Sequence, residues 1–191
     1  MDDYFKKYIL NNNDVYNLFV ELEGKKNEVY NDSGGFPTIG IGHKLTQSEL
    51  TSGKIYIGND SVEYDIRLSD NEIDRLFWQD LEIHYYNIKQ YVFVKLNPNE
   101  MIALISFCYN IGINAFKNST LLKLLNQSHY NEVPDQMRRW KYCKGEIIQG
   151  LINRREKEIA IWNKEYKNYK LDKLLKIKSL IEELINEEAS L

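Results

Sequence analysis

The sequence is poor in residues that bind metal ions, and it has no long hydrophobic run. It contains two cysteines, Cys108 and Cys143, and three scattered histidines, none spaced as in a zinc site. We therefore expect no metal ion and no cofactor. Cys108 lies in an apolar helical pattern, which favours a buried free thiol, although a disulfide with Cys143 stays open. No apolar run approaches the roughly 18 residues of a membrane-spanning helix, so we expect no membrane span.

The chain also has a small excess of negative charge. The net charge of −3 argues against a general nucleic-acid-binding protein. Locally, residues 60–82 hold eight acidic side chains and two arginines, whereas residues 138–157 hold seven basic and two acidic side chains. The basic segment can attract an anionic polymer, but solvated helix faces explain the same pattern equally well.

The beginning of the chain does not resemble a secretion signal. Met1–Lys7 has its acidic residues first, and no long apolar stretch follows. We therefore expect the protein to begin in the cytoplasm or inside a particle, from which it needs another route to any external substrate.

The first third of the chain predicts a small lobe that is mostly sheet, at about residues 14–68. Residues 14–22 carry apolar side chains at helical spacing, and Gly24 follows where glycine commonly closes a helix. Turn residues and β-branched side chains predict four short strands, at 28–30, 38–41, 54–57 and 62–66.

From Ser69 onward the pattern becomes helical, which predicts a larger lobe at residues 69–163. Ser69–Glu72 is a capping box that opens a long helix, and Asn97–Glu100 opens an apolar helix that we expect at the centre of this lobe. Further helices are expected at 119–125, 134–142 and about 150–162. The fold class is therefore α+β, within one domain at residues 1–163.

Residues 164–191 form a separate amphipathic tail with apolar side chains at helical spacing. Its lysines come early and its glutamates late, an order that opposes the helix dipole, so packing must stabilise any helix there. We expect this tail to dock on its own lobe. Pairing with another chain and lying on a membrane are the alternatives.

Two carboxylates and a hydroxyl carry the chemistry of the chain. Asp32 follows Glu23 by nine positions, and Thr38 follows Asp32 by six, in a pattern of helix end, turn and strand. Each residue alone is ordinary in its place. A pair of carboxylates is nevertheless what glycosidic bond hydrolysis needs, because one protonates the leaving oxygen and the other directs water or attacks the sugar. The pattern predicts an enzyme that cuts a polysaccharide.

These residues stand in the frame Glu-Gly-x5-Tyr-x-Asp-x5-Thr-Ile-Gly-x-Gly-His, which closely resembles the phage lysozyme family (glycoside hydrolase family 24, the endolysin muramidases). The resemblance covers about residues 15–162. Further matching segments are Ser106–Gly112, Phe116, Asn118–Leu122, Arg139–Trp140 and Gly150–Glu156. It implies a lysozyme-like fold with an active-site cleft between a sheet lobe and a helical lobe.

The resemblance also implies a reaction, hydrolysis of the β-1,4 bond between N-acetylmuramic acid and N-acetylglucosamine in bacterial peptidoglycan. Glu23 would be the proton donor. Asp32 and Thr38 would hold water on the opposite face of the sugar, giving inversion, for which the carboxyl groups should lie roughly 6.5–9.5 Å apart. Arg154 would pair with Glu23 and orient it, although a nearby cation favours the ionised carboxyl group and an acid catalyst needs its proton.

Three further residues occupy positions that resemble the family's sugar-contacting wall: Lys44, Phe107 and Ser119. Core packing competes with this role for Phe107, and Tyr109 would then replace it. Lys44 departs from the apolar residue that is common at its position. His43 is expected to be structural, because it follows the exit from a Gly-x-Gly strand and the family does not use it for catalysis.

The leading interpretation is an endolysin that lyses the cell wall, held in the cytoplasm of a host bacterium before lysis. A lysozyme carried in a virion, or delivered as an antibacterial effector, is the first alternative. A lytic transglycosylase, which needs no water-positioning carboxylate, and a non-catalytic wall-binding module are the others. Peptidoglycan is the expected partner.

Overall fold

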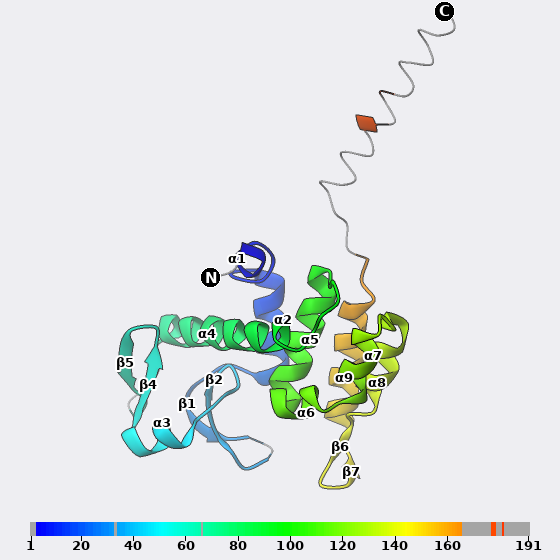
Figure 1. Cartoon of the computed structure of the whole chain (residues 1–191). Helices are drawn as coiled ribbons and strands as arrows, with labels where there is room; N and C mark the ends of the chain where they lie inside the picture. The colour runs from blue at the N-terminus through cyan, green and yellow to red at the C-terminus, as the bar shows by residue number, and fades with distance from the viewer. Residues whose placement is uncertain (1–2, 33, 66, 166–176, 179–180, 182–191) are drawn as a thin grey trace, which may run out of the picture.

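The computed structural model describes residues 3–32, 34–65 and 67–165, together with residues 177, 178 and 181. Helices dominate these residues, and the strands are short (Figure 1). The elements in chain order are α1 (Asp3–Tyr8), α2 (Asn13–Glu23), β1 (Lys26–Asn31), β2 (Pro37–Gly40), β3 (His43–Lys44), α3 (Gln47–Ser52), β4 (Lys54–Ile57), β5 (Asp60–Glu63), α4 (Asp70–Lys89), α5 (Pro98–Ile111), α6 (Ile113–Lys117), α7 (Thr120–Asn126), the 3₁₀ turn η1 (Tyr130–Glu132), α8 (Val133–Arg138), β6 (Tyr142–Cys143), β7 (Glu146–Ile147) and α9 (Gln149–Trp162).

A small sheet region lies beside the first part of α4. Strands β1, β2 and β3 form an antiparallel sheet in that order, and β4 pairs with β5 in a separate hairpin (Figure 1). Ser69 caps α4 by accepting from Glu72 N, while the Glu72 carboxylate accepts from Ser69 N, which is the predicted capping box. The helix therefore begins at a defined point next to the sheet and runs into the helical part of the molecule.

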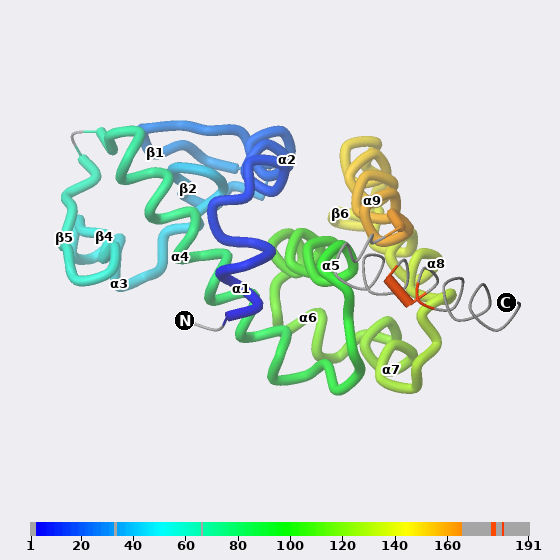
Figure 2. Tube along the Cα trace, turned by 90° about the horizontal axis from the view of Figure 1, so that it is seen from above, coloured from blue at the N-terminus to red at the C-terminus, as the bar shows by residue number. Residues whose placement is uncertain are grey.

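Helix α5 forms the centre of the helical part, as its apolar sequence predicts. Nine of its fourteen residues are buried. Helices α4 and α9 pack against it, and α6, α7 and α8 complete this part of the molecule (Figure 2). A helix that is apolar on most sides needs such a surround, because every exposed face would leave apolar surface in water.

The two N-terminal helices join the core by aromatic contacts. Phe19 of α2 packs against Phe77 and Tyr109, with ring centroids 5.4 and 5.2 Å apart. Phe5 of α1 is fully buried and lies 5.3 Å from the ring of Tyr85. Helix α2, which ends at Glu23, is therefore held against both α4 and α5.

Several boundaries differ from the sequence predictions. The last strand of the sheet region begins at Asp60, not Val62, because the turn of the hairpin is only two residues long. Helix α8 ends at Arg138 instead of reaching Tyr142, which lies in the β6–β7 hairpin. The sequence patterns did not predict α1, β3, α3, α6, η1 or this hairpin, all of which are short. The helix starts at Asn97–Pro98 and Ser69 are confirmed.

Three other expectations meet the structure to different extents. Cys108 is a buried free thiol, as predicted, and Cys143 is free and exposed. No helix among the described residues has the length and apolar character to cross a membrane. The tail lies almost entirely outside the described residues, so its docking and the domain boundary at residue 163 stay predictions.

Candidate active site

Glu23 is the last residue of α2, and its carboxylate is fixed from the far end of the chain. Gly24 closes the helix with φ 77°, and its N–H donates to Val20 O. Glu23 Oε1 accepts a hydrogen bond of 2.6 Å from Arg154 Nη1 of α9, the pairing that the family pattern implies. The Glu23 side chain is 18% exposed and that of Arg154 is 7% exposed. Glu23 therefore combines an anchored oxygen with limited access to solvent.

Asp32 follows β1 in a tight loop that fixes its carboxylate. Oδ1 accepts from the backbone N–H groups of Gly34 and Phe36, each at 2.8 Å, and Oδ2 lies 3.1 Å from Lys44 Nζ. Burial raises the pKa of Asp32, but the Phe36 N–H and the Lys44 ammonium lower it more, so the pKa falls below its usual value. Asp32 is therefore ionised at neutral pH.

Thr38 lies in β2, between Tyr30 of β1 and Lys44 of β3. Directly opposed residues of neighbouring strands point to the same face, so these three side chains form a row across the sheet. Thr38 is nearly fully buried, and its hydroxyl donates to Phe36 O at 2.9 Å. The oxygen of Thr38 therefore keeps lone pairs for another donor.

Tyr30 relates the two carboxylates to each other. Burial raises the pKa of the Tyr30 hydroxyl, and the negative charges of Glu23 and Asp32 raise it further. Both carboxylates thus act on one hydroxyl group in the row that contains Thr38. Lys44, which lies opposite Thr38 in the sheet, contacts Asp32, and Gly42 of the loop between β2 and β3 lies against the Glu23 carboxylate.

The described residues contain no group of three or more His, Cys, Asp or Glu side chains arranged to hold a metal ion. The chemistry available at this site is that of two carboxylates, a hydroxyl and a guanidinium group.

The sequence model of a known family matches this chain. That model, described as phage lysozyme, matches residues 20–158. The chain belongs to the phage lysozyme family. The SAR-endolysin of Escherichia phage Mu is 37% identical over 144 residues, covering 75% of each chain. The endolysin of Salmonella phage P22 is 34% identical over 140 residues, covering 73% of this chain and 88% of its own.

Solved structures agree with this membership. A crystal structure of a mutant P22 lysozyme has a TM-score of 0.63 and 31% identity, and covers 80% of this chain and 97% of its own. The muramidase domain of SpmX from Asticaccaulis excentricus has a TM-score of 0.62 and 25% identity, with coverage of 81% and 97%. The predicted α+β, lysozyme-like fold is confirmed.

One predicted sugar-contacting residue of this phage lysozyme family member is buried in the structure. Phe107 is fully buried, and its ring packs under Arg155 and edge-on against Trp140. Tyr109, the alternative, is partly buried and donates its hydroxyl to Ile41 O at 2.7 Å. Core packing thus accounts for both aromatic residues.

The other two predicted contacts stay accessible. Ser119 is half-buried and caps α7, where its Oγ accepts from Leu122 N and donates to Phe116 O. Lys44 is 55% exposed and pairs with Asp32, and its ammonium group lies over the ring of Phe36. Lys44 therefore stabilises the ionised form of Asp32, independently of any contact with a sugar.

Gly42 is a site residue that was not predicted individually from the sequence. It has φ 76°, and a Cβ atom there would lie 3.0 Å from both Cγ and Oε2 of Glu23. The loop between β2 and β3 thus forms a wall against the carboxylate that only glycine allows. The signal was present in the Gly-x-Gly part of the motif, which marks close backbone approach.

We expect Gly42→Ala to reduce activity by about 10-fold or more, because a displacement of the Glu23 carboxylate by a fraction of an ångström misplaces it. Strain at positive φ should also cost about 1 kcal/mol of stability. Gly53→Ala is the matched control, since Gly53 has φ 70° with nothing within 4 Å of an added Cβ. The measurement is peptidoglycan hydrolysis beside thermal unfolding. Equal activity of the two variants would contradict the role given to Gly42.

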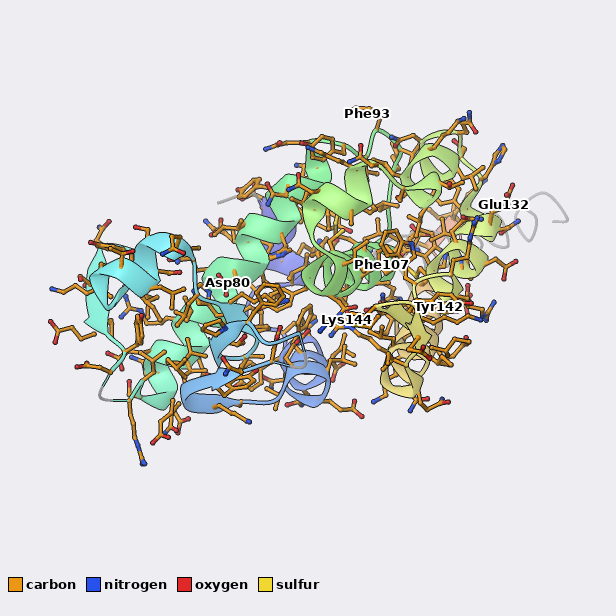
Figure 3. All side chains as sticks on the ribbon, turned by 90° about the horizontal axis from the view of Figure 1, so that it is seen from below. Asp80, Phe93, Phe107, Glu132, Tyr142 and Lys144 are labelled. Atoms are coloured by element: carbon orange, nitrogen blue, oxygen red, sulfur yellow. The ribbon has the colours of Figure 1, made fainter. Side chains whose placement is uncertain are left out.

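His43 links the sheet region to two helices. Its Nδ1 lies 2.8 Å from Asp80 Oδ2 of α4, and its Nε2 lies 3.2 Å from Glu49 Oε1 of α3. Burial lowers the pKa of His43, but the two carboxylates raise it more, to about 10. In Figure 3, Asp80 lies on α4 next to the sheet. These contacts support the structural role predicted for His43.

The contacts of His43 with Asp80 and Glu49 should make the stability of the protein depend on pH. Because the pKa of His43 rises from 6.5 to about 10 on folding, its stabilisation is complete below pH 6.5 and is lost as the pH rises toward 10. The free energy of unfolding of wild type should therefore fall by about 2–3 kcal/mol relative to that of His43→Gln between pH 6.5 and 8.5, at about 1.4 kcal/mol per pH unit. Urea unfolding at each pH measures it. A constant difference would rule out the charged bridge.

Proposed function

We propose that this lysozyme hydrolyses the β-1,4 bond between N-acetylmuramic acid and N-acetylglucosamine, with Glu23 as the acid. The observation that carries the proposal is the geometry of the site: Arg154 holds Glu23 against the loop of Gly42, and Asp32 contacts Lys44, which lies opposite Thr38 in the sheet. The relatives named endolysins and a muramidase support cell-wall lysis as the outcome.

Glu23 has the features that a proton donor needs. Arg154 occupies Oε1, and Gly42 leaves just enough room for Oε2. A carboxyl group with one oxygen anchored keeps the other oxygen free to carry the proton. Glu23 thus protonates the leaving oxygen as the glycosidic bond breaks.

Asp32 and Thr38 have the features that hold a water molecule. Asp32 is ionised and its Oδ2 has accepting capacity beyond Lys44, while Thr38 Oγ1 has already donated its hydrogen. Two acceptors take both hydrogens of one water, and its lone pair then points toward the sugar carbon. The water oxygen attacks the sugar carbon from the face opposite Glu23 while Asp32 takes one of its protons, and Glu23 gives its own proton to the leaving oxygen, which gives inversion.

Substrate binding beyond these residues is proposed for Lys44 and Ser119. The basic segment at residues 138–157 supports attraction of an anionic wall polymer by a chain of net charge −3. We also propose residues 1–163 as the lysozyme domain and residues 164–191 as a tail that docks on it or on another chain. We further propose that the protein is present in the host cytoplasm before lysis, or in a virion.

Digestion of purified peptidoglycan tests the reaction class. Wild type should clear the suspension and release fragments with free reducing N-acetylmuramic acid ends, detected by mass spectrometry. Anhydro-sugar ends would identify a lytic transglycosylase instead. Binding to the wall without any clearing would identify a non-catalytic module.

A further inference from the structure

Behind Glu23 lies a group of buried charges that the proposed mechanism does not use. Arg154, Arg155 and Glu158 follow one another on α9, and their side chains are 7%, 1% and 0% exposed. Ionic groups rarely lose all contact with water unless they are paired, because desolvation is costly. These three side chains should therefore be paired with one another or with neighbouring groups, and Glu158 is the acidic member of the group.

Oε1 of Glu158 accepts three hydrogen bonds. They come from Ser106 Oγ at 2.9 Å, Arg154 Nε at 3.1 Å and Arg155 Nη2 at 3.1 Å. The guanidinium of Arg154 continues to Glu23 Oε1 at 2.6 Å through Nη1 and to Ser106 O at 3.0 Å through Nη2. Arg154 is thus fixed at three nitrogen atoms, and its guanidinium group links Glu158, bound by Nε, to Glu23, bound by Nη1.

The charges of this group bear directly on an acid catalyst. A guanidinium at hydrogen-bond distance favours the ionised form of a carboxyl group, whereas Glu23 must hold a proton. Arg155 adds a second positive charge close to the first, and Arg155 Nε lies 2.8 Å from Glu158 Oε2. Glu158 is the buried negative charge that offsets these two cations.

We propose that Glu158 is a positioning residue for Glu23, which holds Arg154 in place and offsets its charge so that Glu23 keeps its proton to higher pH. The proposal rests on the proposed role of Glu23 as the acid. It explains how an arginine can orient the acid without depriving it of its proton.

The tyrosine and cysteine side chains around this cluster are neutral at pH 7. Tyr30 of β1 and Tyr109 of α5 lie near Glu23, and burial together with its negative charge raises the pKa of both hydroxyls. Cys108 of α5 lies near Glu158, and burial raises the pKa of its thiol. Burial also raises the pKa of Glu158 itself, against the effect of the two guanidinium groups. Asp80 of α4, which is paired with His43, also acts on Tyr109, whereas the guanidinium of Arg154 on α9 contacts Glu23 directly.

The pH profile of kcat/KM on solubilised peptidoglycan strands tests this proposal, because its alkaline limb reports loss of the proton from the essential acid. Glu158→Gln keeps the shape and the acceptor for Ser106 but removes the charge, so the limb should move to lower pH by about one unit. Arg155→Met removes a cation instead, so the limb should move to higher pH. Two shifts of opposite sign are not expected from loosened packing alone.

Two controls accompany these variants. Glu156→Gln removes the same charge from an exposed position on α9, where the side chain is 51% exposed, and should leave the limb unchanged. Glu158→Asp restores the charge at a shorter reach, so its limb should stay near that of wild type while kcat falls.

Three outcomes decide the matter. Opposite shifts in the two variants support the proposal. An unchanged limb in both, or shifts in one direction, overturns it while wild-type hydrolysis still stands. If Glu158→Gln does not fold by circular dichroism, the direction of the Arg155→Met shift decides alone. Full activity of Glu23→Gln would instead overturn the proposed function on which this rests.

Discussion

Replacing Glu23 with glutamine should lower peptidoglycan hydrolysis by about 10³-fold or more, since general acid catalysis supplies about 10²–10⁴ of the rate. The amide has nearly the same shape and its carbonyl oxygen can still accept from Arg154 Nη1, but it cannot deliver a proton to the leaving oxygen. The loss should therefore appear in kcat, with the thermal unfolding temperature nearly unchanged. Turbidity clearing and circular dichroism measure the two effects.

Glu21→Gln is the matched control for this change. Glu21 lies two residues earlier in α2, has a 61% exposed side chain and pairs with Lys157 on the surface. Its replacement removes the same charge but leaves the site intact, so activity should stay at the wild-type level. Comparable loss in both variants would show that charge on α2, and not proton donation, limits the reaction.

Arg154→Ala should weaken both stability and activity. Removing one member of a buried ionic group leaves the others uncompensated, which costs about 3–5 kcal/mol. Glu23 also loses the hydrogen bond that anchors Oε1, so we expect activity to fall by about 10²-fold. Chemical denaturation and peptidoglycan hydrolysis, both at pH 7, measure the two effects.

Two further variants define what Arg154 contributes. Arg154→Lys keeps the charge but not the fork geometry, since one ammonium group cannot meet Glu23, Glu158 and Ser106 O together. It should therefore recover stability more than activity. Arg138→Ala removes an exposed arginine that pairs with Glu156 and should leave both quantities near wild type. An Arg154→Ala variant with wild-type activity would contradict the anchoring of Glu23.

The parts of the fold that the sequence predicts well are those with local signals. The capping box at Ser69 and the Asn97–Pro98 start define α4 and α5, because side chains within three residues decide where these helices begin. Helix α3 has the same signal in Thr46 and Glu49, but it is only six residues long and carries no buried stripe. Short elements without an apolar face leave little in the sequence to detect.

The residues of the site likewise divide into those that a local motif reveals and those that depend on packing. Glu23, Asp32 and Thr38 come from one continuous motif, so their spacing makes them visible in the sequence. Phe107 has the right place in the motif, but whether an aromatic side chain faces a sugar or the core depends on packing that the sequence does not contain.

The role of Glu158 cannot be predicted from the sequence, because it also depends on packing. Its spacing from Arg154 and Arg155 fits ion pairs along one helix, but the same spacing is common on exposed helices. Only its complete burial next to Ser106 of α5 distinguishes it from a surface glutamate such as Glu156.

The anomeric configuration of the first product tests the arrangement of the three side chains most directly. Proton NMR during digestion of soluble peptidoglycan strands records which anomer appears before mutarotation. Water delivered by Asp32 and Thr38 from the face opposite Glu23 predicts the α-anomer of N-acetylmuramic acid at the new reducing end. The β-anomer as first product would contradict this arrangement.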